Sequence, residues 1–460
     1  MKKLLIYLLG ATALLSGCDR KSDLNIDGKS TDQRLSEALA NYQKKLTDAP
    51  YGWILTEYTN GTALNGGVTK SGPKAIFSYY MTFDKSNRVS MISDFSPTMS
   101  TTFNTSSYFI KATQRPTLIF DTYSYVHVPC DPDVSRSQSP FGNGFGWGTD
   151  FEFSFADNVA ATDLGDTIHL TGNLNKTRVT LVKATQADQQ LFSTKGFASY
   201  AAFNQLLTYF KRVKGGTEDI ELTPGTGGRT LNIKSPSHPE LVNVAVQFTA
   251  NNMVFETPIT LGGQTIKSLN NLVWNAGSQN ISVSINGTTP AVIAAALDPI
   301  APEANIAANF YTEGSTNPWL AFVGFHVKGV DDAYDILHLT YPGANFYRFV
   351  YYPGGVNGGS LDLISPFFIG GSVSYPYLRK GLANTYLGDN GQLVFEMLDY
   401  GGIAAPPRLV ATNIILATGK TAPPYPADSY GFYIVRKEDG SSFDMVAAGD
   451  GLAWMTWSHQ

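Results

Sequence analysis

Hydrophobic positions recur with two different periods along the chain, and the change of period separates the predicted elements. Behind a capping box formed by Ser30 and Gln33, apolar residues follow one helical face, at Leu35, Leu39, Tyr42 and Leu46. This pattern predicts an amphipathic helix that ends in the turn-forming segment 48–52. From Trp53 onward the period is two, which is typical of β-strands with one buried face.

The period of two continues through the first part of the chain. Short polar connections such as Asp84–Asn87 separate the apolar runs, so neighbouring strands are expected to pair as an antiparallel meander. Eight or nine such strands predict a lipocalin-like barrel or a sandwich. The predicted strands are Trp53–Tyr58, Ile76–Phe83, Arg88–Ser93, Tyr108–Ala112, Leu118–Phe120, Tyr123–Val128, Phe151–Phe155, Thr167–Thr171 and Val179–Val182.

Helical spacing returns between Phe197 and Arg212, where apolar residues again share one face. This segment predicts a helical divider over residues 191–214 between two β-rich parts of the chain. Beyond the stretch 215–228, which is rich in Gly, Pro and Thr, the period of two resumes. The strands expected there are Thr230–Lys234, Asn243–Thr249, Val254–Thr260, Thr265–Leu269 and Ile281–Ile285.

The expected fold is mainly β and falls into three parts. A short helix and an antiparallel barrel or sandwich occupy residues 30–190, a β-rich domain occupies 215–300, and a C-terminal β-rich domain occupies 301–460. Aromatic residues make up 12% of the chain, charged residues 15%, and glycines number 44. This balance favours β-structure with many turns over a helical bundle.

The start of the chain has the pattern of a lipoprotein export signal. Two lysines precede the apolar run 4–15, which leads into Leu15-Ser16-Gly17-Cys18. The run is too short to cross a bilayer. We therefore expect a signal peptide over residues 1–17 and a polar tether over residues 18–29, with acyl chains such as palmitate on Cys18. The lipid would hold the exported protein on the outer membrane, at its periplasmic face or at the cell surface.

Charge and cysteine content exclude some partners. Removal of the signal peptide takes away two lysines and changes the formal net charge from −5 to −7. An acidic surface disfavours nucleic acid and anionic lipid headgroups as partners. The chain has two cysteines, Cys18 and Cys130. Because Cys18 would carry the lipid, no intramolecular disulfide is expected and Cys130 is expected to be a structural thiol.

Several segments resemble a Bacteroidetes lipoprotein family of unknown function. The resemblance covers roughly residues 30–190 and extends more loosely over 254–274. It is carried by residues 70–95, by Arg115-Pro116-Thr117-Leu118-Ile119-Phe120-Asp121-Thr122-Tyr123, and by Asp150-Phe151-Glu152-Phe153-Ser154-Phe155. Members of that family tend to be encoded beside Sus-type outer-membrane uptake systems. The resemblance therefore implies an accessory role in nutrient acquisition, with Sus-type transporter components as partners.

Common catalytic motifs are absent from the sequence. It contains no HExxH, no GxSxG elbow, no P-loop and no Rossmann glycine fingerprint. Cys130 follows His127 by three residues, but strand geometry would direct these two side chains to opposite faces. We therefore expect a protein without catalytic activity, and the alternative is a hydrolase of unrecognised type that acts on glycan or peptide.

Three carboxylates are candidate calcium ligands, although no cofactor is required by the sequence. Asp131 and Asp133 alternate in one long predicted loop, and Asp150 follows in the same region. Calcium prefers hard oxygen ligands at such spacings. The alternative is a hydrogen-bonded turn that caps the adjoining strands.

Two aromatic segments are candidate ligand-binding sites for a glycan or peptide. In one, Phe145 and Trp147 alternate with glycines, so their ring faces could be exposed on a mobile backbone. In the other, Tyr351 and Tyr352 precede Pro353 and two glycines. The alternative for the first segment is packing over a barrel mouth. Together these features predict a membrane-anchored accessory or binding component of outer-membrane glycan or peptide uptake.

Overall fold

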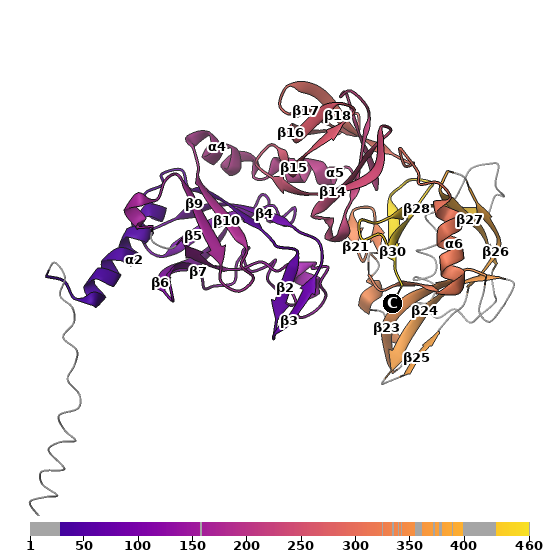
Figure 1. Ribbon diagram of the computed structural model, residues 1–460, viewed down its shortest axis with the longest axis horizontal. Coiled ribbons are helices and arrows are strands. Elements are labelled where there is room, and N and C mark those ends of the chain that lie inside the picture. The colour runs from indigo at the N-terminus through magenta and orange to yellow at the C-terminus, as the bar shows by residue number, and fades with distance from the viewer. Residues whose placement is uncertain are drawn as a thin grey trace, which may run out of the picture.

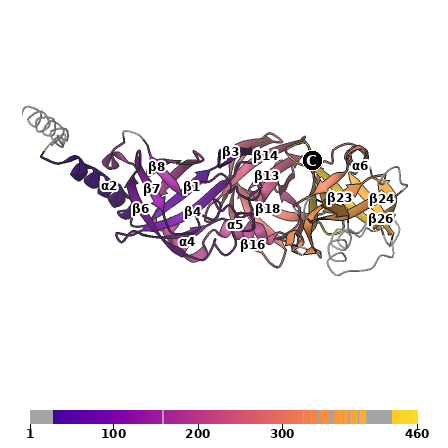
Figure 2. The ribbon, with the colours of Figure 1, turned by 90° about the horizontal axis from the view of Figure 1, so that it is seen from below.

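The computed structural model describes residues 28–459, apart from the segment 399–428 and shorter gaps at 157–158, 324, 334, 339, 342, 355–360, 371–372, 377–379 and 389. The described residues form three β-rich units that follow one another along the long axis of the molecule (Figure 1 and Figure 2). The predicted antiparallel, mainly β fold is confirmed. The signal peptide and the lipidation site Cys18 lie outside the described residues.

Eight antiparallel strands close the first unit into a barrel. Strand β1 pairs with both β4 and β10, so the sheet closes on itself, and a barrel replaces the sandwich alternative. A hairpin of β2 (Thr62–Asn65) and β3 (Val68–Ser71) extends from it. The barrel strands are β1 (Trp53–Tyr58), β4 (Ile76–Phe83), β5 (Arg88–Ser93), β6 (Asn104–Ala112), β7 (Pro116–Phe120), β8 (Glu152–Phe155), β9 (Thr167–Gly172) and β10 (Arg178–Lys183).

Helix α2 (Thr31–Thr47) precedes the first barrel and lies at one end of the molecule (Figure 1). The predicted capping box of Ser30 and Gln33 begins it. Its buried residues Tyr42 and Leu46 join the hydrophobic core of the first barrel. The indole of Trp53 donates a hydrogen bond of 2.9 Å to the carbonyl of Leu46, which fixes the end of the helix on β1. In the part of the chain that the structure describes, no helix is long and apolar enough to cross a membrane.

Residues 121–151 join β7 to β8 and form a loop that contains the short helix α3 (Val134–Ser137). The strand predicted at Tyr123–Val128 is wrong. The amide of His127 donates to the carbonyl of Ser124 at 2.9 Å, and further turn bonds follow. The apolar alternation that suggested a strand instead places Val126 and Val128 in the core of the first barrel. We call residues 121–151 the β7–β8 loop.

Two short helices and a second closed barrel follow. Helix α4 (Gln186–Lys195) and helix α5 (Ala198–Gln205) come first, and a short 3-10 turn, η2 (Thr226–Gly228), connects two strands of the barrel, β12 and β13. Strand β11 pairs with both β12 and β18, which closes the sheet. The strands are β11 (Phe210–Lys214), β12 (Ile220–Pro224), β13 (Thr230–Ser235), β14 (His238–Phe248), β15 (Met253–Leu261), β16 (Gln264–Asn275), β17 (Asn280–Ile285) and β18 (Thr289–Ala296).

The helical divider predicted for residues 191–214 is only partly correct. The helix ends at Gln205, and Phe210–Lys214 is strand β11. Beyond Gln205, Leu206 and Phe210 keep the spacing of a helix but do not share one helical face, because they pack in two different clusters. Leu206 packs with the helices, whereas Phe210 packs on Tyr209 and Tyr433 towards the third unit.

The third unit is also built on an antiparallel sheet, which α6 (Ile306–Thr316) precedes. A bridge between Leu320 in the first strand of the sheet and Ser458 directly after β30 brings these two strands together, with two backbone hydrogen bonds of 2.9 Å. The principal strands are β19 (Trp319–Ala321), β23 (Ala344–Tyr352), β24 (Asp362–Gly370), β26 (Lys380–Leu387), β27 (Gln392–Leu398), β28 (Ser429–Arg436), β29 (Phe443–Ala447) and β30 (Ala453–Trp457). Shorter elements are β20 (His326–Val327), β21 (Val330–Asp331), η3 (Ile336–His338), β22 (Thr340–Tyr341) and β25 (Val373–Pro376).

The first and second units pack on each other through an extended core. Strand β4 is buried on both faces, because its outer face lies against the helices and the second barrel. The rings of Tyr80 and Phe192 stack there at 4.8 Å between centroids. On the same contact, the side chain of Gln247 donates to the hydroxyl of Thr56 at 2.9 Å. This packing fixes the relative orientation of the two barrels.

Candidate ligand-binding surface

Trp147 lies inside the molecule, so the prediction of an exposed ring face at this position is wrong. Its side chain is 1% exposed, and its indole donates a hydrogen bond of 2.8 Å to the carbonyl of Ser137. The ring packs edge-on against Phe77 and lies against Gly227 of the second barrel, where an added Cβ would approach within 2.3 Å. The structure therefore favours the packing alternative for this residue.

The glycines around Trp147 serve close packing. Gly148 has a φ of +67°, and a Cβ at this position would lie 1.9 Å from the carbonyl oxygen of Thr62 in the β2–β3 hairpin. Phe145 is half-buried, and the Lys70 ammonium of the same hairpin lies 4.4 Å from the centre of its ring. The hairpin thus covers this part of the β7–β8 loop.

Tyr351 is also buried, which corrects the second predicted aromatic site. Its hydroxyl donates to Asp362 at 3.1 Å, and its ring stacks near Phe310 of α6. Asp362 accepts further hydrogen bonds from Tyr311 and Thr385, so this carboxylate organises the core of the third unit. Tyr352 is half-buried and packs on the cluster of Leu320, Val350 and Phe367.

The three predicted calcium ligands accept hydrogen bonds in separate places. Asp131 accepts from the hydroxyl of Tyr123 at 2.6 Å, and Asp133 caps α3 through the amide of Ser135 at 2.9 Å. Asp150 accepts from the amides of Leu174 and Asn175 at 2.7 and 3.0 Å. These are the turn and cap bonds of the alternative interpretation. Among the described residues, three metal-ligating side chains converge within 4.8 Å at Asp332, Asp335 and His338.

A buried acid that the sequence analysis missed organises the base of the β7–β8 loop. Glu57 faces the interior of the first barrel, and its Oε1 accepts a hydrogen bond of 2.7 Å from the amide of Asp150. The hydroxyl oxygen of Thr177 lies 2.9 Å from one carboxyl oxygen of Glu57 and also 2.9 Å from one carboxyl oxygen of Asp150. Because the hydroxyl has a single proton, it can donate a hydrogen bond to only one of these two oxygens. Burial raises the pKa of Glu57 well above 4.5, so Glu57 is protonated more readily than an exposed glutamate.

Cys130 lies beside this acid and has the properties of a structural thiol. Its Sγ lies 3.1 Å from the hydroxyl of Thr149, and burial raises the pKa of the thiol well above 9.0. A nucleophilic cysteine needs the opposite, a lowered pKa. The ring nitrogens of His127 are bonded to Ser124 and Phe120, so His127 is not positioned as a base for Cys130.

Three aromatic side chains form a stack on the outside of the first barrel, and we call them the Tyr123–His127–Phe151 stack. Tyr123 is 52% exposed and Phe151 is 39% exposed. The ring of His127 lies 5.6 Å from Tyr123 and 4.7 Å from Phe151, measured between centroids, with interplanar angles of 25° and 30°. The β7–β8 loop therefore presents aromatic surface to solvent at its two ends.

His127 is held in one orientation by hydrogen bonds at both ring nitrogens. Nδ1 accepts from the amide of Ser124 at 3.1 Å, and Nε2 lies 3.1 Å from the carbonyl of Phe120. This pairing requires the neutral tautomer with its proton on Nε2. Burial lowers the pKa of His127 below 6.5, which also favours the neutral ring.

The sequence contained a weak signal for this stack. Tyr123 and His127 lay in a predicted strand, and Phe151 was expected at the start of the next one. The segment Pro129-Cys130-Asp131-Pro132, which begins two residues after His127, favours turns over a continuing strand. The spacing of these residues in the sequence does not show that the two ends of the β7–β8 loop lie next to each other.

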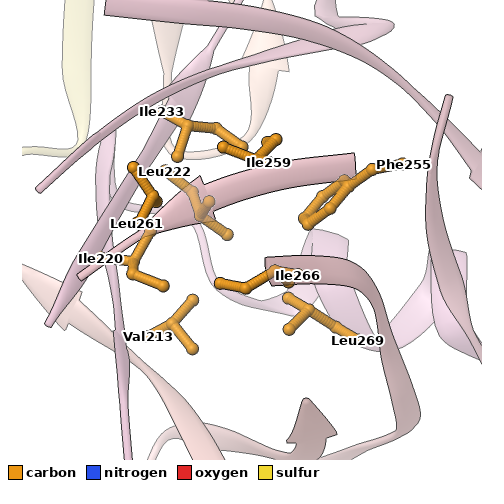
Figure 3. A pocket seen from close by; sticks show the side chains of 9 residues that line it. All are labelled: Val213, Ile220, Leu222, Ile233, Phe255, Ile259, Leu261, Ile266 and Leu269. Atoms are coloured by element: carbon orange, nitrogen blue, oxygen red, sulfur yellow. The ribbon is translucent and has the colours of Figure 1, made fainter. Parts of the chain in front are cut away.

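The second barrel does not offer a ligand chamber. Its interior cavity has a volume of about 10 Å³, which is at the lower limit for a single water molecule. Figure 3 shows that the nine side chains around it are all apolar and converge from several strands. Binding inside this barrel would require displacement of its core. The exposed Tyr123–His127–Phe151 stack is therefore the better candidate for a binding surface.

Likeness to solved structures is distant. The transferrin binding protein B of Neisseria meningitidis is 12% identical, over 89% of this chain and 76% of that chain, with a TM-score of 0.15. A putative outer membrane lipoprotein-sorting protein domain from Vibrio parahaemolyticus is 8% identical, over 56% and 89%, with a TM-score of 0.11. The DNA polymerase III β subunit of Thermotoga maritima is 7% identical, over 92% and 97%, with a TM-score of 0.12. These TM-scores are too low to support an argument about function.

Sequence comparison identifies a family. No curated protein sequence matches the chain. The family model described as "Domain of unknown function (DUF4302)" matches residues 26–276. The matched region contains helix α2, the whole first barrel and the second barrel as far as the end of β16. Since this match covers more than half of the chain, the protein belongs to the DUF4302 family.

Proposed function

We propose that this protein is a membrane-anchored binding component that assists the uptake of a nutrient, a glycan or a peptide, across the outer membrane. It acts without catalysis and is held by the lipid on Cys18. Its partners are a Sus-type transporter and the nutrient itself. The resemblance to a Bacteroidetes lipoprotein family supports the transporter as a partner.

The arrangement of the units supports anchoring at one end. Helix α2 lies at one end of the long axis and the third unit at the other (Figure 2). The expected tether precedes α2 directly in the sequence. A chain attached to a membrane through this tether can extend its barrels away from the lipid surface.

The observation that carries the proposal is the exposed Tyr123–His127–Phe151 stack on a rigid barrel. Aromatic rings on a protein surface supply a large contact area at small entropic cost. The stack lies on a loop whose base is buried with Glu57 and whose Trp147 is packed in the interior. Such a surface is ordered before the ligand arrives, which favours binding.

Deletion of the gene, followed by complementation, tests the proposal. The deletion strain should grow more slowly on a polymeric glycan or on peptides as the limiting carbon source, and the wild-type gene should restore growth. Cys18→Ser should move the protein out of the membrane fraction and fail to restore growth. Retention of Cys18→Ser in the membrane fraction, or normal growth of the deletion strain on every substrate, would contradict the proposal.

A further inference from the structure

We infer that the Tyr123–His127–Phe151 stack binds the sugar rings of a neutral glycan. This inference rests on the proposed function and names the ligand class for the same surface. Tyr123 and Phe151 leave aromatic surface exposed to solvent, and the ring of His127 lies against both. The C–H face of a pyranose ring is flat and apolar, so it can pack on such a surface while its hydroxyls remain in contact with water.

Polar groups around the stack can exchange hydrogen bonds with sugar hydroxyls. The hydroxyl of Tyr123 donates to Asp131 at 2.6 Å, and the hydroxyl of Ser107 lies next to Asp121 and 2.6 Å from that of Thr122. One of these groups, Ser107, lies in β6. The other two, Asp121 and Thr122, follow β7 directly, at the start of the β7–β8 loop. Hydroxyl and carboxylate groups at the edge of an apolar face fix the orientation of a polar ligand.

A glycan fits this surface better than a peptide. Extended peptides commonly bind by adding a strand to an exposed sheet edge. The first barrel is closed between β1 and β10, so its sheet offers no edge for such a strand. A helical peptide needs an apolar groove, whereas the two exposed rings of the stack have polar neighbours such as Asp131.

The local charge selects a neutral glycan over an acidic one. Segment 121–152 contains five carboxylates, of which Asp131 and Asp150 are buried, and one guanidinium, that of Arg136. Arg136 lies 3.8 Å from both Asp131 and Asp133, so its charge is already shared with two acids. Uronate or sulfate groups would approach a surface with an excess of negative charge.

Affinity electrophoresis of the whole mature chain, made soluble by Cys18→Ser, tests the inference. Native gels would contain a neutral polysaccharide (amylopectin, mixed-linkage β-glucan or galactomannan) or polygalacturonate as the acidic probe. We expect retardation by at least one neutral polysaccharide and none by polygalacturonate. Phe151→Ala and Tyr123→Ala should each raise the dissociation constant at least tenfold.

Phe109→Ala is the matched control. Phe109 is 44% exposed on the neighbouring strand β6 and is not part of the stack, so its replacement should leave the dissociation constant unchanged. Thermal melts of all three variants identify any variant that is unfolded. Tyr123→Phe retains the ring if Tyr123→Ala does not fold, and it should retain most of the retardation.

The outcomes separate this inference from the proposed function. If peptides from digested casein bind and Phe151→Ala abolishes that binding, the surface is correct and the glycan class is wrong. If neutral glycans bind equally well to wild type and Phe151→Ala, the stack is not the site, although the uptake function survives. Retardation by polygalacturonate alone would overturn the argument from charge. If no probe is bound by the folded wild type, the inference is wrong, and the growth experiment still decides the proposed function.

Discussion

At the scale of single residues, Trp147 connects two barrels. Its ring belongs to the core of the first barrel and touches Gly227 of the second. Trp147→Ala should lower the free energy of unfolding by about 3–5 kcal/mol, since it removes a large buried ring and leaves a cavity. Chemical denaturation of both proteins measures this difference.

Phe145→Ala is the matched control for Trp147→Ala. Phe145 lies two residues away in the same loop, is half-buried and contacts Lys70. Its replacement should cost about 1 kcal/mol or less. Equal losses for the two variants would show that the loop, and not the buried ring, determines stability.

The buried carboxyl of Glu57 predicts a dependence of stability on pH. Because the folded-state pKa is raised above 4.5, the folded protein keeps a proton that the unfolded chain has already released. The free energy of unfolding should therefore fall as the pH rises from 4.5 towards the folded-state pKa, by at most about 1.4 kcal/mol per pH unit.

Glu57→Gln isolates this effect, because glutamine keeps the shape and the acceptor oxygen for the amide of Asp150 but does not titrate. As the pH rises, the wild type should lose stability relative to Glu57→Gln. Denaturant titrations at several pH values between 4.5 and 8 measure it. Parallel curves for the two proteins would show that Glu57 is ionised in the folded state.

At the scale of elements, strands with one buried face were predictable and the segments between them were not. The bounds predicted for β1, β4 and β5 agree with the structure, because apolar residues mark these strands whether one face is buried or, as in β4, both. The hairpin β2–β3 was missed, since its strands are mostly exposed and carry little apolar signal. The closing strand β11 was mistaken for helix.

The β7–β8 loop shows why the candidate site was only partly predictable. Sequence reasoning pointed to this loop through Phe145 and Trp147, whereas the aromatic surface that the loop exposes is that of Tyr123 and Phe151. An aromatic residue between glycines can be exposed on a flexible loop or buried against another backbone, and local sequence is the same in both cases. In this loop the ring of Trp147 is buried because Gly227 of the second barrel packs directly against it, and because the neighbouring Gly148 lies close to the backbone of Thr62. Exposure is therefore a property of the tertiary structure.

At the scale of the whole molecule, buried polar contacts hold the three units in fixed relation. Between the second and third units, Asp444 accepts a hydrogen bond from Tyr209 at 2.8 Å, and Lys437, which also donates to Asp444, donates to the carbonyl of Pro224 at 3.3 Å. Glu438 accepts from the amide of Thr226 at 2.7 Å and from the side chain of Asn232 at 2.9 Å. A buried charge needs such partners in defined positions, so these contacts oppose sliding of one unit on the other.

Between the first and second units, Arg229 has the corresponding role and gives the last prediction. It forms an ion pair of 3.5 Å with the buried Asp94 and donates to the carbonyls of Asp94 and Phe95 at 3.1 and 3.0 Å. Its guanidinium also lies 4.6 Å from the centre of the Phe77 ring. Burial raises the pKa of Asp94 to about 6, against the opposing effect of Arg229.

Arg229→Ala should therefore destabilise the protein by about 3–5 kcal/mol, because it leaves the Asp94 carboxylate buried without its partner. Arg178→Ala is the control: Arg178 also reaches from the first barrel to the second, at 3.9 Å from Glu256, but its side chain is largely exposed. That variant should lose about 0–1 kcal/mol. Denaturant unfolding of both variants at pH 7 measures the two losses. Equal losses would mean that the barrels are held together by apolar contact alone, with no special contribution from the buried charge.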